Sequence, residues 1–384
     1  MQDKKAAIIR GLRGLCGQVI GGRYRLDQLI AVGGMGAVFR SRHLQLEKDV
    51  AVKLLRPDLS NNREVCARLQ REAKLSSRLD HPNCVRVFDF GTTAEGTRFL
   101  VMELLRGRDL ASLLRRPLAV PHVVEITAQI LEGLDHAHRR GVLHRDVKPG
   151  NIRLVNGDDG RTLVKVCDFG IAKAVGSGVP DTIITQIGTI FGTPVYMSPE
   201  QAAGHEIDQR ADIYSAGVVM YEMLTARPPF QNSDPLALLN AKIEGRVPPI
   251  ANLPPAIAAV MHQMLAVHRK QRFQEATGAA SALRLAGKQS GIPVTPTPHE
   301  WALPVDEELG APEDAGQAAP RSDTSILRAF GAGLDKVLRE PTPHAQARLN
   351  SGIHASPESG LAADQYIDMD NLQLEELGDR DEAD

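Results

Sequence analysis

The stretch HRDVKPGN, residues 144–151, places an aspartate, a lysine and an asparagine close together, with Asp146 five positions before Asn151. Two interpretations are open. Asn151 beside Pro149 and Gly150 is typical of an ordinary turn, because asparagine, proline and glycine all favour turns. Alternatively, Asp146, Lys148 and Asn151 are the polar groups of a reactive site. The segments on either side of this stretch decide between the two.

The first part of the chain reads as strands around one helix. Apolar or alternating runs predict strands at 24–30, 37–40, 50–55, 85–90 and 98–103. Between them, Val65, Leu69 and Leu79 recur at helical spacing within residues 63–79, and Glu72 lies on the same stripe. A carboxylate on an apolar face is costly unless it meets a cation. Glu72 is therefore either paired with a cation or solvated at the edge of the stripe.

Two features of this strand-rich part bear on function. The stretch AVGGMGAVF (31–39) is a glycine cluster, which is either a tight hairpin or a backbone that can approach phosphate groups closely. Lys53 lies in VAVKLL (50–55), which is apolar on both sides, and this setting fits poorly with a surface lysine.

The second part of the chain reads as helices, followed by a polar tail. Helical patterns are predicted at 122–140, 211–225, 255–268 and 275–286. From Ser290 onward the chain holds nine prolines, with 6 Lys and Arg residues against 19 Asp and Glu residues. This composition predicts a largely disordered acidic tail, in which residues 324–340 could form a short helix.

Composition excludes several classes of protein. Four cysteines without C-x-x-C spacing indicate neither a zinc site nor a disulfide framework, and free thiols suit a cytoplasmic protein. No stretch approaches the roughly 18 apolar residues of a membrane helix, so no membrane segment is expected. Residues 1–289 have 39 basic against 28 acidic side chains, but without a basic run or interleaved aromatics. We therefore expect no nucleic-acid partner.

Further motifs follow in order along the chain: VAVK (50–53), HRDVKPGN, DFG (168–170) and GTPVYMSPE (192–200). Over about residues 23–286 the chain resembles the protein kinase family, and within it the bacterial eukaryotic-type (Hanks-type) serine/threonine kinases. The resemblance implies an α+β protein with the bilobal kinase fold. A small, mainly antiparallel β lobe with one C helix precedes a large, mainly α lobe and the largely disordered acidic tail. The implied divisions are an N-terminal segment (1–22), the small lobe (23–105), the large lobe (106–288) and the Pro-rich tail (289–384).

The resemblance implies catalytic roles for Asp146, Lys148, Lys53 and Thr193. Phosphoryl transfer depends on positioning and charge neutralisation more than on covalent help. Asp146 would accept or orient the proton of the attacking hydroxyl, while Lys148 would contact the transferring phosphate. Thr193 would pair with both, which favours serine or threonine as the acceptor. Lys53 would hold the α- and β-phosphates, oriented by an ion pair with Glu72.

ATP is the expected cofactor, together with Mg²⁺, which Mn²⁺ could replace. Asn151 and Asp168 are the expected metal ligands, because hard oxygen donors suit this ion. Ala31 stands where the family has its first glycine, and we expect a small side chain to be tolerated there. Met102 would guard the adenine pocket, with the hinge at 103–105. The expected ATP-binding residues are Ile30, Ala31, Val32, Gly33, Gly34, Met35, Gly36, Val38, Ala51, Lys53, Glu72, Met102, Glu103 and Leu105.

The resemblance also implies control by phosphorylation. Arg145 precedes the catalytic aspartate, as in kinases whose activation loop is phosphorylated. The candidate acceptors are Thr185, Thr189 and Thr182. Structural roles are expected for Glu200, which would pair with Arg272, and for Asp212, which would hold the backbone of the catalytic loop.

The resulting expectation is a cytoplasmic, ATP-dependent serine/threonine protein kinase that acts on protein substrates and phosphorylates its own activation loop. A homodimer through the small lobe is compatible with the resemblance. A different class of function is a pseudokinase-like nucleotide-binding or scaffolding module acting through the acidic tail. The presence of Lys53, Asp146, Asn151 and Asp168 argues against it. A small-molecule phosphotransferase is disfavoured by the 192–200 segment, which in the family forms a platform for peptides.

Overall fold

The structure, a computed structural model, describes residues 9–33, 36–56, 63–157, 162–169, 194–232 and 234–292. Several predicted features lie outside the described residues: Gly34 and Met35, the segment with Thr182, Thr185, Thr189 and Thr193, and the tail with the helix expected at 324–340.

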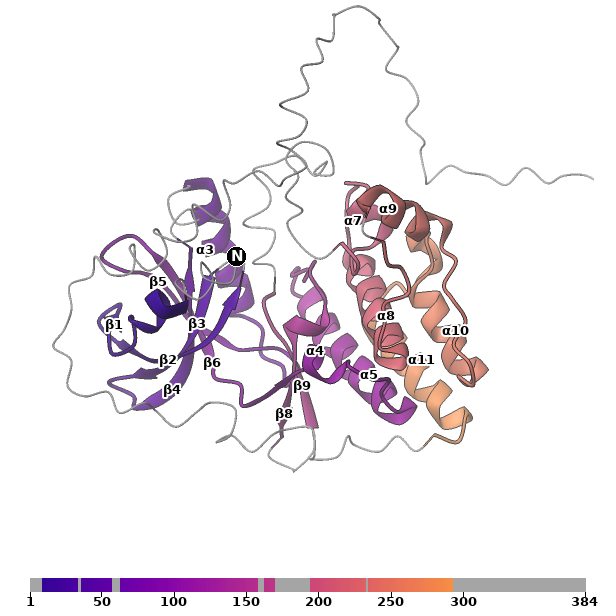
Figure 1. The fold of residues 1–384 in the computed structure, drawn as a ribbon, viewed down its shortest axis with the longest axis horizontal. Helices are drawn as coiled ribbons and strands as arrows, with labels where there is room; N and C mark the ends of the chain where they lie inside the picture. Colours follow the sequence, from indigo (N-terminus) through magenta and orange to yellow (C-terminus); the bar gives the residue numbers. More distant parts are fainter. Residues whose placement is uncertain are drawn as a thin grey trace, which may run out of the picture. The chain divides into compact units, whose positions relative to one another are not determined.

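Six strands form an antiparallel sheet in the order β1-β2-β3-β4-β6-β5 (Figure 1). They are β1 (Val19–Ile20), β2 (Tyr24–Gly33), β3 (Gly36–His43), β4 (Lys48–Leu55), β5 (Val87–Thr92) and β6 (Arg98–Glu103). Helix α3 (Arg63–Ser76) covers one face of the sheet through Leu69 and Ala73. On the other face Leu12 and Leu15, which come before β1, pack against the sheet. The sheet is therefore buried on both faces.

Strand β4 shows how this sheet positions a functional side chain. Val50, Val52 and Leu54 pack on one face, whereas Ala51 and Leu55 pack on the face that α3 covers. Because side chains alternate along a strand, Lys53 shares the α3 face, and only 6% of its surface is exposed. The alternation of side chains thus places the buried ammonium group of Lys53 on the α3 face of the sheet, where it reaches Asp168.

A second sheet, which the sequence patterns did not predict, has three antiparallel strands in the order β7-β8-β9. These are β7 (Gly107–Asp109), β8 (Ile152–Asn156) and β9 (Thr162–Val166). Gly107 is required because a Cβ atom there would lie 2.0 Å from the Leu154 carbonyl oxygen. Strands β8 and β9 connect the HRDVKPGN stretch to Asp168. Because these two strands pair antiparallel, the end of the stretch and Asp168 lie close together.

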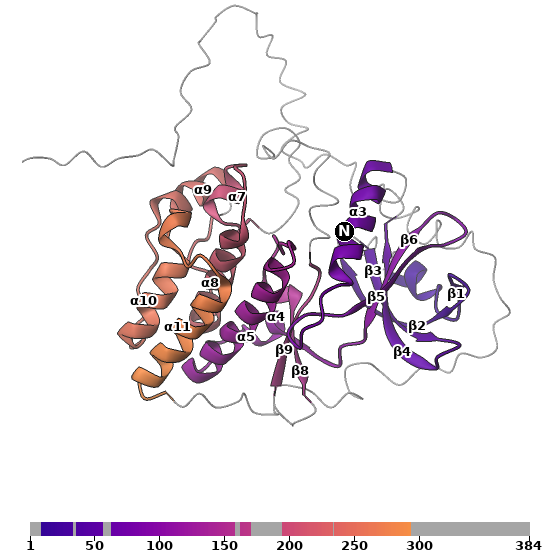
Figure 2. The same cartoon turned by 180° about the vertical axis from the view of Figure 1, so that it is seen from behind.

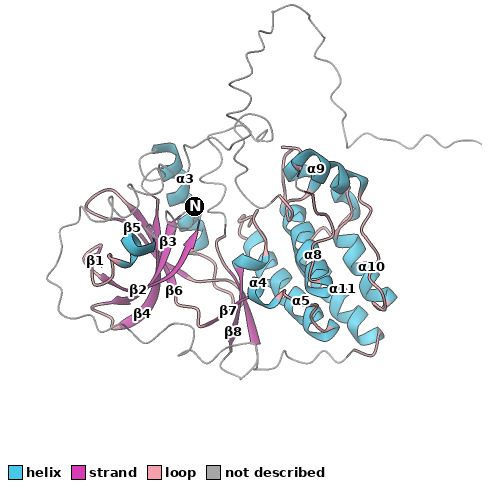
Figure 3. Cartoon of the chain, in the orientation of Figure 1, coloured by secondary structure: helices cyan, strands magenta, loops and turns pink. Residues whose placement is uncertain are grey.

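The remaining described elements are mainly helical, as Figure 3 shows by colour. They are α4 (Leu110–Leu113), α5 (Val120–His138), η1 (Pro149–Asn151), α7 (Pro199–Ala202), α8 (Gln209–Thr225), α9 (Pro235–Glu244), α10 (Pro255–Met264), η2 (Arg269–Gln271) and α11 (Ala276–Gln289). Helices α5, α8, α10 and α11 lie alongside one another in both views (Figures 1 and 2). Helix α8 is buried on almost all sides, which explains why its sequence is apolar all round.

Most of the predicted elements exist, with shifted ends. The strand expected at 85–90 occupies Val87–Thr92, and the helix expected at 255–268 ends at Met264. Helix α8 begins two residues before the predicted 211–225, because the Asp208 side chain accepts a hydrogen bond from the Arg210 N–H and caps it. Helix α9 was missed, since its apolar residues have no clear helical stripe.

Candidate active site

The HRDVKPGN stretch forms a loop that ends in η1, and its polar side chains meet. Lys148 Nζ lies 2.6 Å from Asp146 Oδ2. Asn151 Nδ2 donates to the same oxygen at 3.1 Å and to the Asp146 carbonyl oxygen at 2.8 Å. The three residues therefore form one hydrogen-bonded unit, and the ordinary-turn interpretation does not account for it.

Asp212 of α8 holds the backbone of this loop. Its two carboxylate oxygens accept the backbone N–H groups of His144 at 2.9 Å and Arg145 at 2.7 Å. His138 Nε2 lies 2.7 Å from Oδ2. Arg145 has a φ of 66°, a conformation that is uncommon outside glycine and that these bonds maintain. Burial opposes ionisation of Asp212, but the hydrogen bonds and the nearby histidines hold the pKa of its carboxyl below the usual value.

Lys53 reaches Asp168, not Glu72. Its Nζ lies 2.7 Å from Asp168 Oδ1. Partial burial of Asp168 opposes ionisation, but the charge and hydrogen bond of Lys53 outweigh it and keep the pKa of the carboxyl below its usual value. Glu72 is half-buried on α3, and within the described ranges no ion pair joins it to Lys53. The structure thus brings together Lys53 and Asp168 from distant parts of the chain, whereas the expected Lys53–Glu72 pair is not formed in it.

The oxygen donors near Asp168 suit a hard divalent cation. The Cys167 N–H donates to the Asn151 carbonyl oxygen at 2.8 Å, which places Asp168 directly beside Asn151. Because the Asn151 amide nitrogen is used on Asp146, its Oδ1 remains as a donor to a metal. Within the described residues no cluster of three His, Cys, Asp or Glu side chains could hold a metal. Such a sparse set fits Mg²⁺, which keeps waters and phosphate oxygens as further ligands.

The strands β2, β3, β4 and β6 carry the expected nucleotide-binding residues in register. Ala31 lies opposite Val38, Gly33 opposite Gly36, and Ala51 opposite Met102. Gly36 has a φ of 154°, and a Cβ atom there would lie 1.9 Å from the Leu54 carbonyl oxygen, so only glycine fits. A Cβ at Gly33 would meet nothing within 4 Å. The two glycines therefore differ: one is needed by the hairpin, and the other leaves open space above it.

The remaining expected positions of the pocket have ordinary settings. Ile30 and Val32 belong to β2, and Leu105 follows β6. Met102 is 8% exposed and packs in the core on the α3 face. The Glu103 carboxylate is used elsewhere, since it lies 2.8 Å from Lys165 Nζ and accepts the Arg86 N–H at 2.8 Å. The Glu103 N–H donates to the Arg86 carbonyl oxygen at 2.9 Å, so a hinge at 103–105 would offer the other backbone groups of this segment to a ligand.

Glu200 and Arg272 form a buried bidentate pair. The Arg272 Nη1 and Nη2 atoms lie 2.6 and 2.8 Å from the two Glu200 oxygens. Arg272 is 2% exposed and also donates to the carbonyl oxygens of Arg210, Ala266 and Val267. This pair ties α7, which contains Glu200, to the chain directly after η2.

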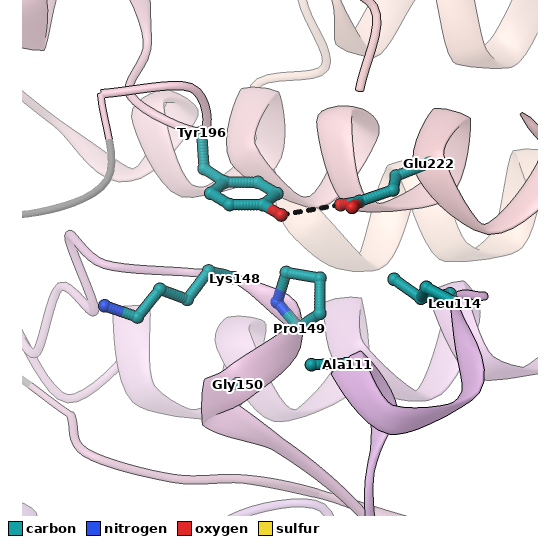
Figure 4. Close-up of a pocket in the computed structure, with 7 residues that line it drawn as sticks. All are labelled: Ala111, Leu114, Lys148, Pro149, Gly150, Tyr196 and Glu222. Atoms are coloured by element: carbon teal, nitrogen blue, oxygen red, sulfur yellow. Dashed lines mark hydrogen bonds between the residues drawn. The ribbon is translucent and has the colours of Figure 1, made fainter. Parts of the chain in front are cut away.

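A cavity of about 240 Å³ lies next to Lys148 (Figure 4). Its lining residues are Ala111, Leu114, Lys148, Pro149, Gly150, Tyr196 and Glu222. On one side of the cavity the Tyr196 hydroxyl donates to Glu222 Oε2 at 2.7 Å (Figure 4). Burial raises the pKa of the Glu222 carboxyl, and the Tyr196 hydrogen bond opposes this rise. Glu222 was not predicted from the sequence, although a second carboxylate besides Asp212 within the otherwise apolar α8 is a signal that could have found it.

Comparison with known proteins agrees with the site. The family described as "Protein kinase domain" matches residues 24–283. The serine/threonine-protein kinase pkn3 of Myxococcus xanthus is 39% identical over 367 residues, which cover 90% of this chain and 67% of that protein. The serine/threonine-protein kinase PknA of Mycobacterium tuberculosis is 35% identical over 359 residues, 91% of this chain and 77% of that protein.

A similar solved structure is the kinase domain of M. tuberculosis PknI, with 26% identity and a TM-score of 0.56 over 72% of this chain and 100% of that one. The chain belongs to the protein kinase family, and within it to the bacterial Hanks-type serine/threonine kinases. The expectations of the kinase fold and of a phosphotransferase of this class are confirmed.

Two further expectations can be compared with the structure. All four cysteines lie in the described ranges, and no disulfide bond joins any of them there. In the part of the chain that the structure describes, no helix has both the length and the apolar character needed to cross a membrane.

Proposed function

We propose that this kinase transfers the γ-phosphoryl group of Mg-ATP to serine and threonine hydroxyls of proteins, with Asp146 and Lys148 as the groups that act on the acceptor. The observation that carries the proposal is the hydrogen-bonded unit of Asp146, Lys148 and Asn151, which Asp212 anchors beside Asp168. A set of this composition can position a hydroxyl, neutralise phosphate charge and hold a divalent cation in one place.

Each residue of the unit has a distinct task. Asp146 orients the acceptor hydroxyl and takes its proton, while Lys148 stabilises the charge on the phosphoryl group that is being transferred. Asn151 and Asp168 hold Mg²⁺, which neutralises phosphate charge when it is bound. Thr193 completes the acceptor side by pairing with Asp146 and Lys148.

Lys53 binds the α- and β-phosphates in this proposal. The ion pair with Asp168 keeps its ammonium group at the boundary where the phosphates would lie. The ion pair of Lys53 with Glu72, which the described part of the structure does not contain, remains a prediction. The backbone of the glycine stretch covers the phosphates, and Met102 with the 103–105 segment bounds the adenine site.

Regulation through the activation loop is also proposed. Phosphorylation of Thr185 or Thr189, with Thr182 as a further candidate, would place a dianion near Arg145. Charge-assisted hydrogen bonds would then order the loop. Mass spectrometry of the active enzyme tests this, and full activity without phosphate in the loop would disprove it.

Further proposals concern the metal ion, the cellular location and the partners of the kinase. We propose Mg²⁺ as the working metal, with Mn²⁺ as a substitute, and a cytoplasmic location, which cysteines without disulfide bonds in the described ranges and the use of ATP support. A homodimer through the small lobe and the absence of a nucleic-acid partner remain predictions.

The test compares the full chain with Asp146→Asn for transfer of labelled phosphate from Mg-ATP to itself and to casein. Transfer by the wild type and its loss in Asp146→Asn, with nucleotide binding retained, is the expected result. Equal transfer by both proteins would refute the role of Asp146. No transfer by either would refute the proposed activity of the chain.

A further inference from the structure

The segment 195–197 is held in place through its backbone carbonyl groups, which accept hydrogen bonds from side chains of two helices. Lys242 Nζ on α9 donates to the carbonyl oxygens of Val195 at 2.8 Å and Met197 at 2.5 Å. Between them, the Ser215 hydroxyl of α8 donates to the Tyr196 carbonyl oxygen at 2.8 Å. Three consecutive carbonyl groups therefore accept hydrogen bonds from two helices. The segment cannot move away from α8 and α9 without leaving these groups unpaired.

The same segment forms a wall of the cavity beside Lys148. The Tyr196 side chain lies on one side of the cavity together with its partner Glu222 and faces Pro149, as Figure 4 shows. Just downstream, Gln201 of α7 donates from its side-chain amide to the Arg145 carbonyl oxygen at 3.0 Å. The segment is thus linked to the cavity through Tyr196, and the helix that follows it, α7, is linked to the catalytic loop through Gln201.

Lys242 is an unusual residue for this place. It is 1% exposed, and among the residues that the structure describes no carboxylate forms an ion pair with it. A buried ammonium group is costly unless its hydrogen bonds are made, and the two carbonyl oxygens provide them. Burial lowers the pKa of Lys242 to about 7, while the charge of Glu200 opposes this shift.

We propose that Lys242 is a positioning residue for the protein substrate: by holding the Val195–Met197 backbone, it keeps the cavity wall formed by Tyr196 in the conformation that receives the polypeptide around the acceptor hydroxyl. The inference rests on the proposed function, because it needs a polypeptide acceptor beside Lys148. Lys242 touches neither the reacting groups nor the nucleotide-binding strands. Its effect should therefore fall on the protein substrate and not on ATP.

The test measures kcat and the two KM values, for casein and for Mg-ATP, in the full-length protein and in Lys242→Met. Methionine keeps the length of the side chain but cannot donate to the carbonyls. We expect the KM for casein to rise about tenfold, as the loss of two hydrogen bonds to one segment implies, with the KM for ATP within about twofold of the wild type.

Two further variants, a stability control and a second substitution at the same backbone segment, separate a positioning role of Lys242 from a loss of stability. Leu283→Ala removes a fully buried side chain of α11 and should lower the unfolding temperature without changing the ratio of the two KM values. Ser215→Ala removes the bond to the central carbonyl and should raise the KM for casein in the same direction as Lys242→Met. If Lys242→Met and Leu283→Ala change the kinetic constants alike, Lys242 is merely structural and the proposal fails.

The pH profile gives an independent readout. The groups that face Lys242 or its partners are Glu200 of α7, Tyr214 of α8, whose ring lies 5.5 Å from the ammonium group, Arg272, which pairs with Glu200, and the Tyr196–Glu222 pair. Above neutral pH the amine loses its charge, and its hydrogen bonds to the carbonyls weaken. The KM for casein should therefore rise with pH in the wild type. It should stay flat in Lys242→Arg, whose guanidinium remains charged.

The comparison of the two pH profiles tests the role of Lys242 even if Lys242→Met does not fold. A rising profile in the wild type and a flat one in Lys242→Arg supports the proposal, and identical profiles overturn it. A wild-type protein with no transfer to casein or to itself would instead refute the proposed function, so the two failures are distinguishable.

Discussion

Replacing Glu200 by glutamine should destabilise the large helical part of the kinase severely. The substitution removes the negative charge that faces Arg272 but keeps the size and one acceptor oxygen of the side chain. Arg272 is 2% exposed, and both terminal nitrogens of its guanidinium contact the Glu200 carboxylate at 2.6 and 2.8 Å. Removing one partner of a buried pair leaves an uncompensated charge, which costs about 3–5 kcal/mol.

That cost corresponds to an unfolding temperature lower by roughly 6–20 °C, at ~2–4 °C per kcal/mol for a domain of this size. The carboxylate of Glu200 also raises the pKa of Lys242, so the variant should leave that lysine more neutral. Arg272→Met should cost at least as much, because it also frees the carbonyl oxygens of Arg210, Ala266 and Val267.

The assay is urea unfolding followed by far-ultraviolet circular dichroism. The single tryptophan, Trp301, lies outside the described residues, so helical signal is the better probe. The double variant Glu200→Gln/Arg272→Met should lose less free energy of unfolding than the two single variants together, since the second change removes the charge that the first exposed. A loss below about 1 kcal/mol for Glu200→Gln, or strict additivity in the double variant, would refute the reasoning.

Three further predictions follow from single side chains. Gly36→Ala should raise the KM for ATP and lower the unfolding temperature, because its Cβ would meet the backbone of β4, whereas Gly33→Ala should keep the wild-type unfolding temperature; equal unfolding temperatures in the two variants would contradict this. Asp212→Asn should make the stability of the protein less sensitive to acid. The pKa of Asp212 is depressed in the folded protein, so the carboxylate stabilises the fold above the unfolded pKa of 3.8, and this stabilisation is lost as the pH falls through the folded pKa. Acid titration of the variant and the wild type, followed by circular dichroism, measures the difference. Tyr196→Phe leaves Glu222 without its 2.7 Å partner and should cost about 1–3 kcal/mol in urea unfolding while raising the KM for casein; an unchanged KM would show that this cavity wall does not contact the substrate.

Local spacing made the hydrogen-bonded unit of the HRDVKPGN stretch predictable. Asp146, Lys148 and Asn151 are at most five residues apart, so one turn of backbone is enough to bring their side chains together. The burial of Lys53 was likewise implied by the apolar residues on both sides of it and by the alternation of a strand. The stripe of α3 placed Glu72 on an inward face, and the structure finds it half-buried.

Features that depend on packing between distant segments were not predictable. The β7-β8-β9 sheet pairs the short β7 with the distant β8, which pairs in turn with its chain neighbour β9. The need for a close approach at Gly107 is visible only in three dimensions. The partner of Lys53 was predicted as Glu72 but is Asp168 in the structure, 115 residues away. Which carboxylate meets the lysine depends on where α3 lies against the sheet, and no local pattern contains that information.

The sequence by itself determined the family and the order of its motifs along the chain, because these follow from residue types at short, regular spacings. Only the tertiary structure decided how the cavity beside Lys148 and the 195–197 backbone are supported. Tyr196 meets Glu222 across 26 residues, and Lys242 meets the Val195 carbonyl across 47. Contacts of this kind form when helices pack and buried polar groups must find partners, and the chain's local propensities do not specify which partners those are.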